Sequence, residues 1–87
     1  MNVKKGLLLK EVAGNYIVVA VGSAVKVLNG AITLNETGAL LWKLLENGTD
    51  FDTLVNTLTS EYGVEKSIAI KDVGEFLDKL QKADLLA

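Results

Sequence analysis

The chain has 87 residues, a formal net charge of −2 and 49 % hydrophobic residues, and it contains no His and no Cys. It also lacks Arg and Pro, since all nine basic residues are Lys. These absences exclude His-based catalytic triads, thiolate or imidazole metal sites, and the bidentate Arg contacts that hold phosphates and guanine edges. We therefore expect a protein that is not an enzyme and needs no metal or cofactor. The length suits one hydrophobic core, which predicts a single domain over residues 1–87.

Composition also bears on location and partners. The N-terminal stretch MNVKKGLLLKEV has only three consecutive leucines, which is too short for the apolar part of a signal peptide. No uncharged apolar run approaches the length that spans a membrane. Without cysteines nothing indicates an oxidising compartment, and the acidic balance disfavours a nucleic-acid partner. We expect a soluble cytoplasmic protein with no membrane or nucleic-acid association.

The first third of the chain is typical of strands. Residues 7–12 (LLLKEV) and 16–21 (YIVVAV) flank the turn signal Ala13-Gly14-Asn15, which predicts an antiparallel hairpin. A second hairpin is predicted from residues 25–28 and 31–34, because the intervening Asn29-Gly30 suits a type I′ turn. Residues 23–28 are equally compatible with an irregular turn.

From Asn35 onward the apolar period becomes helical. Asn35 is the expected N-cap with Glu36 in the first turn, although Thr33 to Glu36 also fits a capping box. One face of this first helix carries Leu40, Leu41, Leu44 and Leu45, and Asn47-Gly48 ends it. Trp42 lies about 90° from the leucine face, so we expect it at the edge of the core rather than as a binding anchor.

Two more helices follow. The second is expected to start at Thr49 as its cap and to end at Gly63, and its apolar stripe is formed by Phe51, Leu54, Val55, Leu58 and Tyr62. The third runs from about residue 65 to 82 and carries its apolar face on Ala69, Val73, Phe76, Leu77 and Leu80. Strands followed by helices predict a small α+β domain, winged helix-turn-helix-like, with a three-stranded antiparallel sheet followed by three helices.

Strand 31–34 carries neither charge nor Pro, the usual guards on an exposed sheet edge. At an edge it could pair with an extended peptide through main-chain hydrogen bonds; in the centre of a sheet it could not. On the third helix, Ile68, Asp72 and Lys79 share one flank of the buried stripe. The opposite flank carries Ile70, Gly74 and Gln81, and the sequence leaves open which flank lines a groove.

Two other functions are weaker alternatives. A winged-helix DNA-binding regulator would present a basic helix, whereas the third helix mixes four Lys with four acidic residues between positions 65 and 82. An acidic carrier protein would need a modifiable Ser at a helix start in an Asp-Ser-Leu context. Ser23, Ser60 and Ser67 lack that context.

The stretch ITLNETGALLWKLLENGTDFDTLVNTLTSEYGV, followed by KDVGEFLDKLQKADLL, closely resembles the PqqD-like family, named after pyrroloquinoline quinone biosynthesis protein D. The resemblance covers about residues 7–86. Its marks are Leu34-Asn35, Glu36-Thr37-Gly38, Trp42, Gly48-Thr49, Tyr62, and Asp72-Val73 through Phe76-Leu77 to Leu80. The chain departs from the family at Gly74, where a polar helix former is usual.

The resemblance implies a RiPP recognition element, a non-catalytic module for ribosomally synthesised, post-translationally modified peptides. Such a module binds the leader segment of a precursor peptide and presents it to a modifying enzyme, commonly a radical S-adenosylmethionine maturase. By resemblance, the leader adds as a strand beside Ala31, Ile32, Thr33 and Leu34 and lies against the third helix near Asp72, Val73 and Phe76. Ile68, on the flank of Asp72, is a further candidate for this peptide-binding site. An unoccupied bare edge would also favour a weak homodimer.

Overall fold

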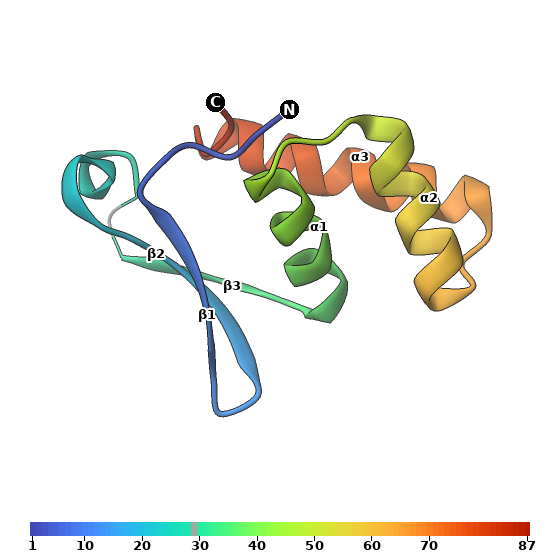
Figure 1. Ribbon diagram of the computed structural model, residues 1–87, viewed down its shortest axis with the longest axis horizontal. Helices are drawn as coiled ribbons and strands as arrows, with labels where there is room; N and C mark the ends of the chain where they lie inside the picture. Colours follow the sequence, from blue (N-terminus) through green and yellow to red (C-terminus); the bar gives the residue numbers. More distant parts are fainter. Residues whose placement is uncertain (29) are drawn as a thin grey trace.

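The computed structural model describes residues 1–28 and 30–87 (Figure 1). The strands are β1 (Leu7–Val12), β2 (Asn15–Ala20) and β3 (Ala31–Leu34), with a short 3₁₀ helix, η1 (Gly22–Lys26), before β3. The helices are α1 (Glu36–Glu46), α2 (Phe51–Tyr62) and α3 (Lys66–Lys82). This order confirms the predicted fold class, a three-stranded antiparallel sheet followed by three helices.

The sheet has the strand order β1-β2-β3, and both pairs are antiparallel. The β1–β2 hairpin closes through Ala13 and Gly14, whose φ values of 53° and 80° identify a type I′ turn. Its last pair is Val12 opposite Asn15. On the other side of β2, Val18 lies opposite Ile32. Among the described residues β3 pairs with β2 alone, so β3 is an edge strand.

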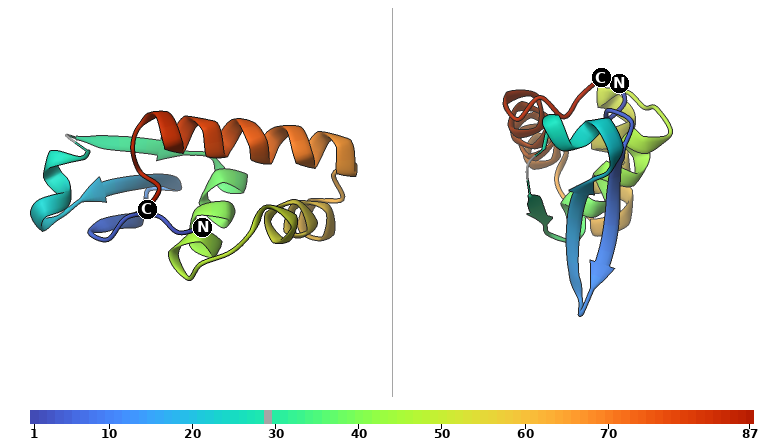
Figure 2. Two further views of the ribbon diagram at one scale, coloured as in Figure 1. Left: turned by 90° about the horizontal axis from the view of Figure 1, so that it is seen from above. Right: turned by 90° about the vertical axis from the view of Figure 1, so that its left-hand side faces the viewer.

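Side-chain alternation gives the sheet a buried inner face and an exposed outer face. Leu7, Val18 and Leu34 point inward and are buried, whereas Leu8 and Thr33 point outward and are exposed. The helices complete the core, in which the largest fully buried side chains are Trp42, Leu45, Leu54, Leu80, Leu85, Val18 and Val73. α3 follows the same course as β3 in the opposite chain direction (Figure 2, left).

Of the two alternatives for residues 23–28, the strand is wrong and the irregular turn is right, because η1 and the turn that follows it occupy this segment. Gly22 has a φ of 62°, and the amides of Val27 and Leu28 donate to the carbonyl of Ala24 at 2.9 and 3.0 Å. Ala24 is buried against Gly6: a Cβ placed on Gly6 would lie 2.8 Å from that of Ala24. This close packing overrides the strand preference of the valines. The predicted Asn29-Gly30 turn involves Asn29, which lies outside the described residues.

The N-caps of α1 and α2 were predicted from the sequence to within one residue. Asn35 is confirmed as the N-cap of α1, since its Oδ1 accepts from the Gly38 amide at 2.8 Å. The predicted cap of the second helix is wrong by one residue: Asp50, not Thr49, is the N-cap, and it accepts from the Thr53 amide at 2.7 Å. Asp and Thr are both good caps, and only the backbone path decides between neighbours.

Two predictions of burial need correction as well. Trp42, expected at the core edge, is 0 % exposed and lies at the centre of the core. The apolar stripe of α2 is longer than the surface against which the helix packs. Its two ends, Phe51 and Tyr62, are therefore 36 % and 39 % exposed. The middle of that stripe is buried as predicted.

The Asp50 cap makes stability depend on pH. Hydrogen bonds from the side chain and the backbone of Thr53 lower the pKa of Asp50 below its ordinary value of 3.8. A lowered native pKa means that the stabilisation is complete above pH 3.8 and is lost as the pH falls through the native pKa. We expect Asp50→Asn, which retains a capping oxygen, to lack this component. Thermal unfolding of both proteins between pH 7 and pH 2 should therefore give curves that converge in acid, and parallel curves would contradict the assignment.

Candidate functional site

The hydrogen-bonding pattern of the sheet identifies the backbone groups on the free side of β3. A type I′ turn has a hydrogen bond from the amide of its last residue, Asn15, to the carbonyl of its first, Val12. Bonded pairs alternate along an antiparallel ladder, so Asn15, Ile17 and Val19 direct their backbone groups toward β1. Tyr16 and Val18 therefore direct theirs toward β3.

The same alternation continues across β3. Tyr16 lies opposite Leu34 and Val18 opposite Ile32, so the amides and carbonyls of Leu34 and Ile32 face β2. Those of Ala31 and Thr33 then face away from the sheet. We call this free side of Ala31–Leu34 the open edge; it offers one amide and one carbonyl at every second residue.

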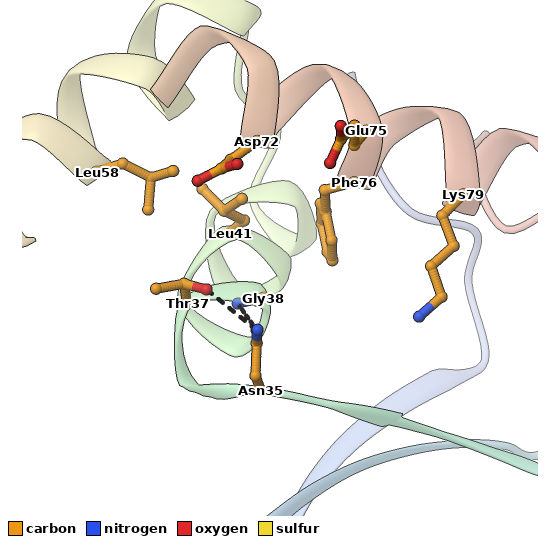
Figure 3. Close-up of a pocket in the computed structure, with 9 residues that line it drawn as sticks. All are labelled: Asn35, Thr37, Gly38, Leu41, Leu58, Asp72, Glu75, Phe76 and Lys79. Carbon is orange, nitrogen blue, oxygen red and sulfur yellow. Dashed lines mark hydrogen bonds between the residues drawn. The ribbon is translucent and has the colours of Figure 1, made fainter. Parts of the chain in front are cut away.

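Beside the open edge lies a cleft of about 320 Å³ between the start of α1 and α3 (Figure 3). Its lining residues are Asn35, Thr37, Gly38, Leu41, Leu58, Asp72, Glu75, Phe76 and Lys79. Leu41 and Leu58 are each 2 % exposed and form an apolar floor. Half-buried Phe76 stands in the middle of the cleft, and the exposed side chains of Asp72, Glu75 and Lys79 form the α3 side of its rim.

The N-cap of α1 shapes the near wall of the cleft. Asn35 Oδ1 accepts from the Gly38 amide at 2.8 Å and from the Thr37 hydroxyl at 3.1 Å. A Cβ on Gly38 would lie 3.0 Å from Asn35 Oδ1 and 3.3 Å from Phe76 Cε1. The missing side chain thus lets the Phe76 ring approach the helix start closely while the cap stays intact.

Only some of the residues predicted for the site lie at the cleft or at the open edge. Asp72 and Phe76 line the cleft, and Ile68, one helical turn before Asp72, is 49 % exposed but does not line it. Val73 is 0 % exposed and belongs to the core, so its side chain does not reach the cleft. Residues 31–34 form the open edge, from which the cleft continues at Asn35.

The flank of α3 that the sequence left open is decided by the fold. The cleft is lined by Asp72 and Lys79, on the flank of Ile68, whereas Ile70 and Gly74 on the other flank do not line it. Sequence reasoning missed seven lining residues as site residues: Asn35, Thr37, Gly38, Leu41, Leu58, Glu75 and Lys79. The first five carry the signals of a helix start or an apolar stripe, and the last two are typical surface charges, so none of them indicates a binding surface by itself.

Two features are absent from the described part of the chain, residues 1–28 and 30–87. No group of three or more acidic residues there could hold a metal ion. Within the same residues no helix is both long and apolar enough to cross a membrane. What the site supplies is an unpaired strand edge, an apolar floor and a charged rim, which together suit an extended peptide.

These features define an α+β, winged-helix-like fold with a strand-edged cleft. The family model for coenzyme PQQ synthesis protein D (PqqD) matches residues 8–86. The chain therefore belongs to the PqqD family, as the sequence motifs predicted.

Two solved structures share the fold. One is TbiB1 in complex with the TbiA(beta) leader peptide, which has a TM-score of 0.79 at 21 % identity over 99 % of this chain and 94 % of that chain. The other is lasso peptide synthetase B1 complexed with the leader peptide, with a TM-score of 0.76 at 21 % identity over 97 % of this chain and 93 % of that chain. The comparison with curated proteins found no match.

Proposed function

We propose that this protein binds the leader segment of a ribosomally made precursor peptide by strand addition to β3 and presents that peptide to a modifying enzyme. The observation that carries the proposal is the open edge, where β3 pairs on one side only and leads at Asn35 into a cleft with an apolar floor and a charged rim. The PqqD family and two similarly folded proteins that were solved with leader peptides support the same function. Neither comparison supports the DNA-binding alternative.

Each part of the proposed site has a distinct task. The backbone groups of Ala31 and Thr33 hydrogen-bond the leader and set its register. Half-buried Ile32, on the inner face of β3, and Phe76 contact apolar leader side chains, while the buried side chain of Leu34 anchors β3 to the core. Asp72 contributes charge at the rim.

Two of the predicted site residues, Ile68 and Val73, lie outside the cleft and have different roles in the proposal. Exposed Ile68 extends the apolar contact beyond the end of the cleft. Buried Val73 supports α3 from the core and so acts on the leader only through the position of the helix.

The protein acts in this proposal as a binding partner that performs no chemistry itself. The enzyme that receives the leader is a radical S-adenosylmethionine maturase, and both work in the cytoplasm. Residues 1–87 form one peptide-recognition domain. These statements follow from the family resemblance and from the few catalytic roles that a chain without His and Cys can fill.

The free protein is proposed to form a weak homodimer through the open edge, because an unguarded strand pairs readily with a second copy. Sedimentation at decreasing protein concentration measures this directly. A dimer that dissociates on dilution, and that leader peptide also dissociates, is the expected behaviour. A particle of monomer mass at every concentration would refute it.

The experiment that tests the function is a backbone amide NMR titration with the leader peptide encoded beside the gene. We expect the largest shift changes at residues 31–34 and at residues 68–79 of α3, with little change at β1, the far edge of the same sheet. Changes centred on β1 would move the docking site to that edge. The absence of changes with any neighbouring leader would remove the proposed function.

A further inference from the structure

Charge is distributed unevenly along the cleft. Asp72 lies above Leu41, Glu75 lies beside Phe76, and Lys79 extends toward β3 at the other end (Figure 3). All three charged side chains are exposed. None takes part in the two ion pairs of the described residues, Lys4–Asp84 and Lys82–Asp78, so their charges are available to a ligand.

The direction of an added strand follows from the sheet. Both existing strand pairs are antiparallel, and antiparallel pairing is slightly more stable per residue than parallel pairing. A peptide antiparallel to β3 starts near Leu34 and ends near Ala31. Because α3 also runs opposite to β3, the peptide passes the acidic end of the cleft first and Lys79 last.

The spacing of the charges can be compared with that of a strand. Asp72 and Lys79 are seven residues apart on a helix, which is about 10 Å along its axis. Side chains on one face of a strand recur every second residue, about 7 Å apart, so three such positions span about 14 Å. The difference is smaller than the length of a lysine side chain. Three cleft-facing peptide residues therefore match the acidic end, Phe76 and Lys79 in turn.

We propose, on the basis of the proposed function, that this order of charges selects the leader sequence and fixes its register. The recognised segment carries a basic, an apolar and an acidic residue at every second position, in that order from N to C. The basic side chain pairs with Asp72 and Glu75, and the apolar one packs on Phe76 above Leu41 and Leu58. The acidic side chain pairs with Lys79.

The test is selection of surface-displayed random 15-residue peptides on the fluorescently labelled full chain. We expect enrichment of the basic–x–apolar–x–acidic order over its reverse by at least tenfold. Enriched peptides without a charge order, or with the reverse order, would overturn the inference while the proposed function stands. A failure to enrich any peptide would overturn both.

A charge-reversed protein provides the second measurement. The triple variant Asp72→Lys, Glu75→Lys and Lys79→Glu changes only exposed side chains, so folding should survive and is checked by its amide spectrum. It is expected to enrich the reverse order, acidic–x–apolar–x–basic. Retention of the original preference would show that these three residues do not read the leader.

A matched control alters the same number of charges elsewhere. Glu46→Lys, Asp52→Lys and Lys10→Glu shift the net charge by the same amount, and all three residues are exposed and outside the cleft. This control should keep the wild-type preference. If it also inverts or erases the preference, overall charge and not the order along the cleft governs selection, and the inference fails.

Discussion

Thr33→Pro is expected to weaken leader binding at least tenfold while leaving the free energy of unfolding nearly unchanged. The register directs the Thr33 amide to the open edge, so proline there removes a donor that the sheet does not use. Binding loses one main-chain hydrogen bond, about 1 kcal/mol, and the ring obstructs the incoming strand. Calorimetric titration with the leader peptide and urea unfolding measure the two effects separately.

Ile32→Pro is the matched control one residue away. Its amide faces β2, so proline at this position breaks the existing ladder and also removes a half-buried side chain. We expect a loss of about 3 kcal/mol of stability or more. Equal destabilisation by the two proline variants would place both sides of β3 inside a paired sheet and would refute the open edge.

Trp42→Ala is expected to have the largest effect on stability. Trp42 is 0 % exposed and is among the largest fully buried side chains of the core. Its truncation removes apolar contact area and leaves a cavity, which costs about 3–5 kcal/mol. Small domains are stable by about 5–15 kcal/mol, so the variant should unfold at a much lower urea concentration or fail to fold.

Trp42→Phe separates the apolar contribution of the side chain from its polar one. Within the described residues Nε1 of Trp42 is buried without a hydrogen-bond partner. Burying an unpaired N–H is unfavourable, and Phe removes that group while retaining most of the ring. We therefore expect less than half the loss caused by Ala, measured by the same urea unfolding. Equal losses would show that the core requires the full shape of the indole.

Several features of this protein could be predicted from the sequence because their causes are local. Asn35 caps a helix through a bond to an amide three residues away, and Gly63 ends the next helix with a φ of 63° that suits glycine. The β1–β2 hairpin depends on two turn residues, and alternation along the strands separates a core face from an exposed face. Such signals act within a few residues, and together they determined the fold class.

Other features needed contacts between distant segments. η1 replaces the expected strand because Ala24 packs on Gly6, eighteen positions earlier in the chain. Trp42 is central because β-sheet and helices close around it from several sides. A helical wheel of α1 gives the angle between Trp42 and the leucine face, but it does not show where the neighbouring elements lie.

The candidate site divides in the same way. By itself the sequence determined the uncharged strand 31–34, the family motifs, and the absence of the residue types that most catalysis requires. Only the tertiary structure decided that β3 lies at an edge, that the Thr33 amide and not that of Ile32 is free, and that the Asp72 flank of α3 lines the cleft. The physical reason is that all three are relations between elements: the edge and the register are set by the pairing of β3 with β2, and the cleft forms where Leu41, Leu58 and Phe76 meet from three helices.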